Sequence, residues 1–267
     1  MITKKEFEKI KESISNFKYH SMEYTEFEDV AKHDIICNDD NLILIYGYNE
    51  QDSLYQYNYA FNDHKDFVKA LSNCKKDDLL TFVNKEWVED LRRIGFDIYA
   101  IWCSYFAHDL NKYKNDTPIE FVAKNEYKEV SEVTLSCRYQ SRGFSGQSEE
   151  WIQQWVDNKV VDYTKDCNII VKKINGIIAG VVCVGVYGHE SKKGPILWVR
   201  ELAVRPEFQK MGIGRELLGQ AFAYGLEKGA TRSFLAADEC NHGAIHLYKS
   251  MGYQADENDR EINMIHN

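Results

Sequence analysis

The stretch ELAVRPEFQKMGIGRELL, residues 201–218, decides the fold of this chain. It begins as an apolar strand that ends at Val204, passes through a loop with Gly212 and Gly214, and continues with helical spacing. Small residues at a strand-to-helix junction let main-chain N–H groups approach an anion, and the helix N-terminus adds the positive end of its dipole. The loop therefore predicts a phosphate site, although two glycines one position apart also occur in loops that bind nothing.

Three kinds of phosphate loop compete for this stretch. A Walker loop needs GxxxxGK[ST], and the chain has no such run. A dinucleotide fold would use the glycines and Asp238, which lies 24 residues beyond the second glycine. However, Leu217 replaces the third glycine, and seven residues separate Val204 from Gly212, so a nicotinamide-dependent enzyme is disfavoured. The third pattern is Q/R-x-x-G-x-G/A, and the segment that starts at Gln209 supplies it.

The chain is patterned as two segments, with a polar break near residues 110–118 that contains Pro118. We expect an N-terminal domain over residues 1–115 and a second domain over residues 116–267. Hairpins followed by a strand–helix–strand unit predict a mixed α/β sheet in the second domain. Its predicted elements are a strand at 119–125, helices at 127–140 and 148–158, a hairpin turning at 175–176, strands at 196–204 and 232–238, helices at 214–230 and 241–252, and two strands within 253–265.

From Val199 to Tyr253 the chain resembles the GNAT superfamily of acetyl-CoA-dependent N-acyltransferases. The loop at residues 209–214 is similar to one family signature, and NHGAIHLYKSMGY at residues 241–253 is similar to a second. Two signatures in this order are more specific than either one alone. The order of predicted elements also resembles the family fold, so the resemblance implies an α/β acyl-CoA N-acyltransferase fold for the second domain.

The resemblance implies roles for individual residues. Leu202, Ala203 and Val204 would offer main-chain groups to the pantetheine arm, as an added strand would. Asn241 would contact the same arm, and the Tyr248 hydroxyl would protonate the leaving thiolate. By themselves, Asn241 is equally a helix N-cap and Tyr248 equally a core aromatic. The residues implied to bind the pyrophosphate are Gln209, Lys210, Met211, Gly212, Ile213, Gly214 and Arg215.

The implied reaction is direct transfer of the acetyl group of acetyl-CoA to a primary amine of a small molecule or peptide. The attacking amine must lose a proton, so a base or a water chain is needed. Relatives commonly carry basic side chains where this chain has Trp198 and Arg200, and neither residue is a base. Glu201 is the nearest carboxylate, but its pleat parity is opposite unless a bulge turns it inward. Asp238 and Glu239 are the fallback candidates.

A non-catalytic acyl-CoA-binding or regulatory module is the alternative function, since the usual base is absent from the strand. A second feature that motivates it lies in the first domain. There, LLTFVNKEWVEDLRRIGF at residues 79–96 repeats the order strand, asparagine, helix, glycine, and the spacing from Asn84 to Gly95 is eleven, as from Asn241 to Gly252. Leu91 takes the place of the tyrosine. We therefore interpret residues 1–115 as a degenerate GNAT-like copy, although asparagine and glycine caps recur in any such unit.

Composition sets the remaining expectations. The 267 residues carry a net charge of −9 without a basic run, which argues against nucleic acid and agrees with an amine substrate or simply with solubility. Seven scattered cysteines without a CxxC pair indicate neither a metal site nor disulfides, and hence a reducing cytoplasmic location. No apolar run approaches the roughly 20 residues of a membrane span. We expect a monomer or homodimer. Trp151 and Trp155, four apart, predict core packing rather than a substrate pocket.

Overall fold

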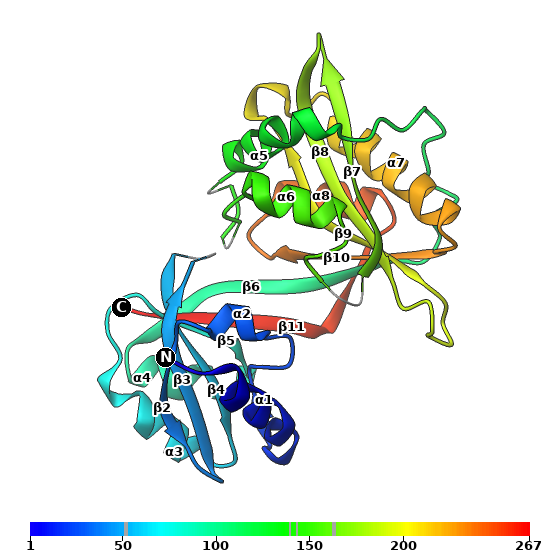
Figure 1. Cartoon of the computed structure of the whole chain (residues 1–267). Helices are drawn as coiled ribbons and strands as arrows, with labels where there is room; N and C mark the ends of the chain where they lie inside the picture. Colours follow the sequence, from blue (N-terminus) through cyan, green and yellow to red (C-terminus); the bar gives the residue numbers. More distant parts are fainter. Residues whose placement is uncertain (51–52, 139, 143, 162–163) are drawn as a thin grey trace. The chain divides into compact units, whose positions relative to one another are not determined.

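The computed structural model describes residues 1–50, 53–138, 140–142, 144–161 and 164–267. These residues form two compact units, which can be followed by colour in Figure 1. Unit 1 consists of Met1–Ile101 together with Glu261–Asn267, and unit 2 consists of Trp102–Arg260. Two strands, β6 (Phe96–Ala107) and β11 (Gln254–His266), contribute residues to both units.

Unit 1 is built on a mixed sheet. The strand order is β2-β3-β4-β5-β11, with β1 beside β4. Strands β2, β3 and β4 are antiparallel neighbours, whereas β5 runs parallel to β4 from the pair Tyr55–Asp78 to the pair Tyr57–Leu80. The elements are α1 (Lys4–Ser13), β1 (Tyr19–His20), α2 (Phe27–Val30), β2 (Asp34–Asn38), β3 (Leu42–Asn49), β4 (Leu54–Phe61), α3 (His64–Ala70), β5 (Asp78–Val83) and α4 (Val88–Arg93).

Beyond Tyr57, strands β4 and β5 have no further residue pair among the described residues. The side chain of Tyr59 lies where the two strands diverge. Its hydroxyl is 2.9 Å from the carbonyl oxygens of both Thr81 and Phe82, so its proton is shared between them. Tyr59 is fully buried, and the protein therefore fills this divergence with its own aromatic side chain.

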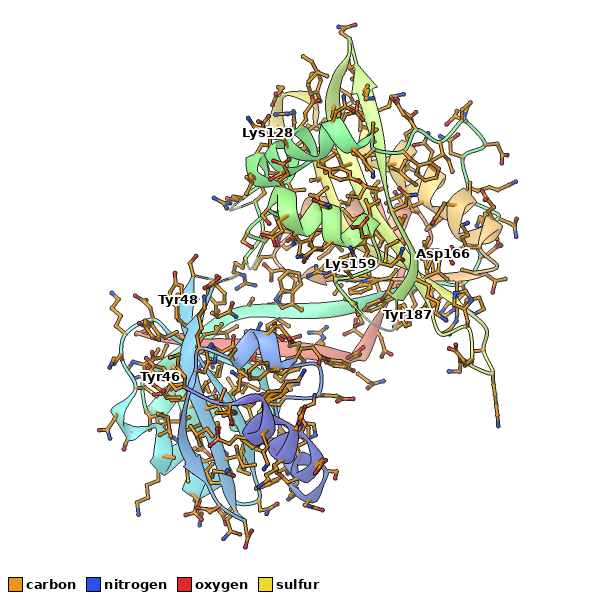
Figure 2. The ribbon with its side chains drawn as sticks, in the orientation of Figure 1. Tyr46, Tyr48, Lys128, Lys159, Asp166 and Tyr187 are labelled. Atoms are coloured by element: carbon orange, nitrogen blue, oxygen red, sulfur yellow. The ribbon has the colours of Figure 1, made fainter. Side chains whose placement is uncertain are left out.

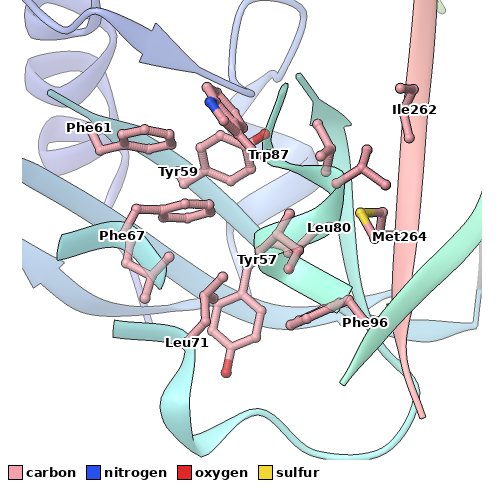
Figure 3. Packing of buried hydrophobic residues seen from close by; sticks show 14 of the residues in the cluster. Tyr57, Tyr59, Phe61, Phe67, Leu71, Leu80, Trp87, Phe96, Ile262 and Met264 are labelled. Carbon is pink, nitrogen blue, oxygen red and sulfur yellow. The ribbon is translucent and has the colours of Figure 1, made fainter. Parts of the chain in front are cut away.

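The core of unit 1 is aromatic, as Figure 3 shows. Phe61 stacks on Phe67 with ring centroids 4.3 Å apart, and Trp87 packs against Phe61 at 4.9 Å. Such ring pairs contribute about 1 kcal/mol each beyond the area that they bury. Ile262 and Met264 belong to the same cluster, so the end of β11 is part of the core of unit 1.

Unit 2 is also built on a mixed sheet, with strand order β7-β8-β9-β10-β6. Helices α5 and α6 lie on one face and α7 on the other (Figure 1). Two glycines of β8 mark the two faces: a Cβ at Gly180 would meet Ile213 of α7 at 2.9 Å, and one at Gly185 would meet Trp155 of α6 at 3.4 Å. The elements are α5 (Tyr127–Ser136), α6 (Glu149–Val156), β7 (Thr164–Ile174), β8 (Ile177–Tyr187), β9 (Ile196–Val204), α7 (Ile213–Glu227), β10 (Arg232–Asp238) and α8 (His242–Ser250).

The local signals of the second segment are confirmed. Asn175 and Gly176 both have left-handed backbone angles, with φ of 52° and 80°, and they join the paired strands β7 and β8. The predicted apolar face of α7 is buried, and Gly229, with φ of 85°, follows the helix as its predicted terminator. The buried residues of that face are Leu217, Leu218, Ala221 and Tyr224.

Two predicted elements are wrong. Residues 119–125 form one isolated bridge, from Phe121 to Ile170, rather than a strand. The pairing stops because the Ala123 N–H donates to the carboxylate of Glu126, which begins a short 3-10 turn. Residues 253–265 do not form two strands, since β11 is continuous. The charged stretch in its middle contains no glycine or proline to reverse the chain.

The last strand of each segment pairs with a strand of the other. Strand β6 follows α4 in the sequence but pairs with β10, and β11 follows α8 but pairs with β5. The compact units consequently differ from the predicted segments 1–115 and 116–267, whose boundary stays a prediction. Leaving aside the two-residue strand β1 between α1 and α2 and the strands β6 and β11, the two units share one order of elements: two helices, three antiparallel strands, a helix, a strand parallel to the third, and a short helix.

The predicted fold class, a mixed α/β sheet, is confirmed in both units. Within the described part of the chain, no helix is long and apolar enough to cross a membrane. The same residues include no group of three or more His, Cys, Asp or Glu side chains placed to hold a metal ion.

Candidate functional site

Strands β9 and β10 diverge in unit 2. They are parallel from the pair Ile196–Arg232 to the pair Trp198–Phe234, and beyond Trp198 no described residue of one strand pairs with the other. From there to Val204, β9 pairs only with β8 among the described strands. The free edge of β9 thus runs along Leu202, Ala203 and Val204, where an extended ligand can add as a strand would. The carbonyl oxygen of Val204 is already used, since it accepts from Cys137 Sγ and from Gln209.

The loop that follows β9 forms an open N-terminus for α7. Gly212 takes the N-cap position with φ of 84°, and Lys210 is also left-handed, with φ of 61°. A side-chain oxygen is therefore absent at the cap, where Ser, Thr or Asp would normally accept from the first turn. Within the described residues, no acceptor pairs with the main-chain N–H groups of residues 210–215. These donors and the positive end of the helix dipole fit a phosphate.

The two glycines of the loop are required for different structural reasons. At Gly212 a Cβ would meet nothing within 4 Å, so its requirement is the left-handed backbone. At Gly214 a Cβ would lie 3.0 Å from Leu247, so this glycine lets α7 approach α8 closely. Met211 is largely exposed, and Ile213 is buried beneath the loop. The groups that the loop can offer to an anion are therefore mainly main-chain N–H groups.

Two polar side chains of the loop, Gln209 and Arg215, form hydrogen bonds within the protein. Gln209 donates from Nε2 to the carbonyl oxygen of Val204 at 2.9 Å and to Oε1 of Gln140 at 2.8 Å. Arg215 turns toward the end of α8, where it donates to Oγ of Ser250 at 2.6 Å. Gln209 thus fastens the loop to the end of β9. Lys210, which is exposed, is the cation of the loop that remains on its surface.

Helix α8 carries the second pair of predicted residues. Asn241 is its N-cap, and Oδ1 accepts from the Ala244 N–H at 3.2 Å, so the simple capping role is realised. Tyr248 is buried, and its ring packs near those of Tyr105 and Tyr253, with centroids 6.4 and 5.9 Å away. Burial, with a smaller contribution from the charge of Glu201, raises the pKa of Tyr248. The hydroxyl is consequently protonated throughout the neutral pH range.

A β-bulge turns Glu201 toward α5 and α6. The register between β8 and β9 shifts between the pairs Cys183–Glu201 and Val184–Val199, which leaves Arg200 as the extra residue. Trp198 packs into the cluster beneath α5 and α6, and Glu201 accepts from Gln147 of the connection between these helices. Strand alternation allowed Glu201 to serve as a base only if a bulge turned its side chain inward, and the structure contains this bulge.

The Glu201 carboxylate is held at one oxygen. Its Oε1 accepts from Nε2 of Gln147 at 2.8 Å and from a guanidinium nitrogen of Arg200 at 2.7 Å. No described residue donates to Oε2. The carboxyl is 5% exposed, and burial raises its pKa despite the opposing effects of Arg200 and Gln147. A carboxylate with a raised pKa and one open oxygen is suited to accept a proton.

The fallback candidate Asp238 is differently placed. Arg142 donates to it in a bidentate arrangement, from Nε at 2.9 Å and from a terminal nitrogen at 2.6 Å. Burial raises the pKa of Asp238, but these bonds, together with the N–H of Cys240, outweigh burial and lower it. Asp238 is therefore a poor base, and it fixes the end of β10 to residue 142 of the α5–α6 connection.

Three residues that the sequence did not single out come from that connection. Gln140 contacts Gln209 of the loop, Arg142 contacts β10, and Gln147 contacts β9. The connection thus reaches both diverging strands and the loop. Its sequence has no spacing pattern that would indicate these contacts. Trp155 of the adjacent helix is fully buried, as predicted for core packing, and its ring stacks on Trp151 at 5.2 Å.

Comparisons with known proteins agree on one family. The model of the acetyltransferase (GNAT) family matches residues 128–253. Over 76 residues the chain is 32% identical to a thialysine N-epsilon-acetyltransferase of Bos taurus, and this stretch covers 28% of this chain and 45% of that protein. Over 108 residues it is 28% identical to an uncharacterised N-acetyltransferase of Methanocaldococcus jannaschii, which is 40% of this chain and 46% of that protein. The chain thus spans less than half the length of these two relatives.

A solved structure extends the likeness in fold to the whole chain. An acetyltransferase of the GNAT family from Colwellia psychrerythraea has a TM-score of 0.56, with 12% sequence identity. The match covers 100% of this chain and 97% of that one. At this level of identity the likeness concerns the fold alone.

Proposed function

We propose that the chain is a GNAT-type acetyltransferase, since the model of the acetyltransferase (GNAT) family matches residues 128–253. In this proposal it transfers the acetyl group of acetyl-CoA to a primary amine of a small molecule or peptide. The observation that carries the proposal is the row of N–H groups at residues 210–215, for which the described residues provide no acceptor, directly beyond the free edge of β9. An ester of pyrophosphate with an extended amide-bearing arm fits such a row followed by such an edge.

In this proposal, acetyl-CoA is the cosubstrate and supplies the activated acyl group. The loop from Gln209 to Arg215 holds its pyrophosphate, with main-chain groups as the donors. The edge of β9 at residues 202–204 holds the pantetheine arm, and the side-chain amide nitrogen of Asn241 is available to the same arm because only Oδ1 caps the helix. No side chain of the protein forms a covalent bond during transfer.

Tyr248 is the proposed general acid. As the amine nitrogen bonds to the acetyl carbon, the carbon–sulfur bond breaks and the thiolate takes the hydroxyl proton of Tyr248. The raised pKa of Tyr248 keeps this proton in place at neutral pH. Because no described residue hydrogen-bonds to the hydroxyl, the proton is free to be directed at the ligand.

Glu201 is the proposed base. Its open oxygen Oε2 accepts the proton that the amine must lose, directly or through one water. The bonds from Gln147 and Arg200 to Oε1 keep the carboxylate in place. Burial makes the carboxylate a stronger base than an exposed glutamate, since it raises the pKa.

We also propose that residues 1–115 are a degenerate copy that binds no acetyl-CoA. The parallel strands of both units pair over three residues and then diverge, but in unit 1 the side chain of Tyr59 fills the divergence. The N-terminus of α3 is closed as well, because Asp63 accepts from the N–H groups of Lys65 and Asp66. A carboxylate at that position excludes a phosphate by its charge and by occupying the donors.

Two measurements test the proposed function together. Calorimetric titration with acetyl-CoA measures binding, and thiol release across a panel of amines measures turnover. Binding with turnover of at least one amine supports the enzyme. Binding without turnover of any amine supports the alternative, a non-catalytic acyl-CoA-binding module. Absence of binding contradicts both.

A further inference from the structure

Unit 2 contains two ion pairs in which a buried carboxylate is covered by a partly exposed arginine. In the pair Arg200–Glu201 the side chains are 29% and 4% exposed, and in the pair Arg142–Asp238 they are 32% and 0% exposed. Each pair is neutral as a whole, but the group that reaches solvent is the guanidinium. The accessible surface next to Glu201 is therefore cationic, although the chain carries a net charge of −9.

The two arginines differ in how many of their donors are used. Arg142 gives Nε and a terminal nitrogen to Asp238, so one full edge of its guanidinium is occupied. Arg200 gives one terminal nitrogen to Glu201, and no described residue accepts from its other nitrogens. A guanidinium has five N–H donors in a fixed planar fork that matches a carboxylate. Arg200 therefore retains a free edge formed by Nε and a terminal nitrogen, whereas Asp238 already occupies that edge in Arg142.

The guanidinium of Arg200 is also held in position by aromatic rings. It lies over the ring of Trp198, with 5.6 Å from Cζ to the ring centroid. That ring is fixed edge-on by Trp155 at 5.7 Å and by Tyr187 at 6.3 Å. Tyr187, labelled in Figure 2, is the last residue of β8. A planar cation fixed on a partly buried aromatic ring is pre-organised, so it loses little freedom when it binds an anion.

We propose that the acceptor amine also carries a carboxylate, and that the free edge of Arg200 binds this carboxylate. The proposal rests on the proposed acetyl transfer and specifies the chemical class of its acceptor. It separates amino-acid-like amines from diamines and polyamines. A polyamine would have to place a second ammonium group beside the guanidinium of Arg200, where like charges repel.

The decisive experiment compares amines that differ only in the carboxylate. Suitable pairs are lysine with cadaverine, ornithine with putrescine, and phenylalanine with phenethylamine. We expect kcat/KM with the wild-type protein to be about 10- to 100-fold higher for the acid-bearing member of at least one pair, which is the worth of one charge-assisted hydrogen bond. Equal or better use of the decarboxylated member in every pair that reacts overturns the proposal.

Two variants separate carboxylate binding from a general loss of structure. Arg200→Gln removes the fork, and we expect it to abolish the preference mainly through KM for the acid-bearing amine. Arg200→Lys keeps the charge but not the fork, so an intermediate preference is expected. Arg142→Gln serves as the comparison, since we expect it to lower activity on both members of a pair by the same factor. A fall by the same factor for both members in Arg200→Gln overturns the proposal.

Failure of the proposed function gives a different result from failure of this inference. If no amine is acetylated, the same pairs are titrated into the protein saturated with coenzyme A. Tighter binding of the acid-bearing member, lost in Arg200→Gln, supports the inference even without turnover. Equal binding of both members, or binding of neither, contradicts it.

Discussion

The side-chain amide of Gln147 donates a hydrogen bond of 2.8 Å to Oε1 of Glu201, across 54 positions of sequence. The bond joins the α5–α6 connection to the bulged part of β9, and both side chains are buried. Because Oε1 is occupied, the second oxygen is the one left to take up a proton. The base in the proposed mechanism is thus positioned by a residue that cannot itself act as a base.

Gln147→Leu should shift the pH dependence of activity. The bond from Gln147 lowers the pKa of Glu201 against the larger effect of burial, so its loss should raise that pKa further. The acid limb of the kcat/KM profile should then move to higher pH, while KM for acetyl-CoA stays unchanged. Gln154→Leu is the control, since Gln154 lies exposed on α6 and its side chain hydrogen-bonds to Glu150 alone among the described residues. An unmoved acid limb in Gln147→Leu would remove Glu201 from the role of base.

Tyr248→Phe should retain acetyl-CoA binding but lose turnover. A general acid typically contributes about 100- to 10,000-fold, and we expect a fall in kcat at the lower end, about 100-fold, since water can partly replace the hydroxyl. The hydroxyl has no partner among the described residues, so its removal should leave Tm within about 1 °C. Equal kcat in both proteins at every pH from 6 to 9 would refute the assigned role.

Gly212→Ala should weaken acetyl-CoA binding. The residue has φ of 84° and open space around a Cβ, so alanine introduces backbone strain of about 1 kcal/mol and pulls the N–H groups of the loop out of position. Gly176→Ala is a matched control, because Gly176 has φ of 80°, equally open space and a place in the distant β7–β8 hairpin. Calorimetry should give a Kd raised about tenfold for the first variant alone. Similar Kd values for the two variants would show that the loop does not bind the cofactor.

Glu201→Gln and Asp238→Asn should change stability in opposite directions at neutral pH. The folded-state pKa of Glu201 is raised, so its stabilising effect is complete below the unfolded pKa of about 4.3 and is lost as pH rises through the folded value. Glu201→Gln removes the cost of burying the ionised carboxylate. It should therefore raise Tm relative to wild type at pH values above the folded-state pKa of Glu201.

The folded-state pKa of Asp238 is lowered, so its contribution is present above the unfolded pKa of about 3.9 and is lost as pH falls through the folded value. Asp238→Asn also leaves Arg142 without its ionic partner. A loss of about 2 kcal/mol, or about 5 °C in Tm, is expected at pH 7. Thermal denaturation of both variants at pH 4 and pH 7 checks the signs, and a change of the same sign for both at pH 7 would contradict the assignment.

The chain should bind one acetyl-CoA. In unit 1, Asp63 closes the N-terminus of α3. The Tyr59 hydroxyl donates to the carbonyl oxygens of Thr81 and Phe82 in β5, where β4 and β5 diverge. Calorimetric titration should therefore give a stoichiometry of one, and Gly212→Ala should weaken that single site. A second site that survives in Gly212→Ala would show that unit 1 is not degenerate in this respect.

Much of the fold could be predicted from the sequence because its signals are local. The Asn175–Gly176 turn, the apolar face of α7 and the glycine after it each depend on residues within one element. The strand pairing of β6 with β10 and of β11 with β5 could not be predicted, because neither strand carries a pattern that names its partner.

The candidate site divides in the same way. The loop from Gln209 to Arg215 has a fixed spacing, so its residues could be identified in the sequence. Arg142 and Gln147 could not, because their partners lie 96 and 54 positions away. The orientation of Glu201 depended on a bulge, which shifts the side-chain parity by one residue without any glycine or proline to mark it.

Acetyl transfer with Tyr248 as the proton donor can be checked in one comparison. Thiol release and the acetylated product are measured together for the wild-type protein and Tyr248→Phe, at saturating acetyl-CoA, with the amine panel and from pH 6 to 9. We expect one thiol released per acetylated amine in the wild type, and about 100-fold less of both in the variant at an unchanged Kd for acetyl-CoA. Thiol release equal in the two proteins, or no acetylated amine from the wild type with any member of the panel, would contradict it.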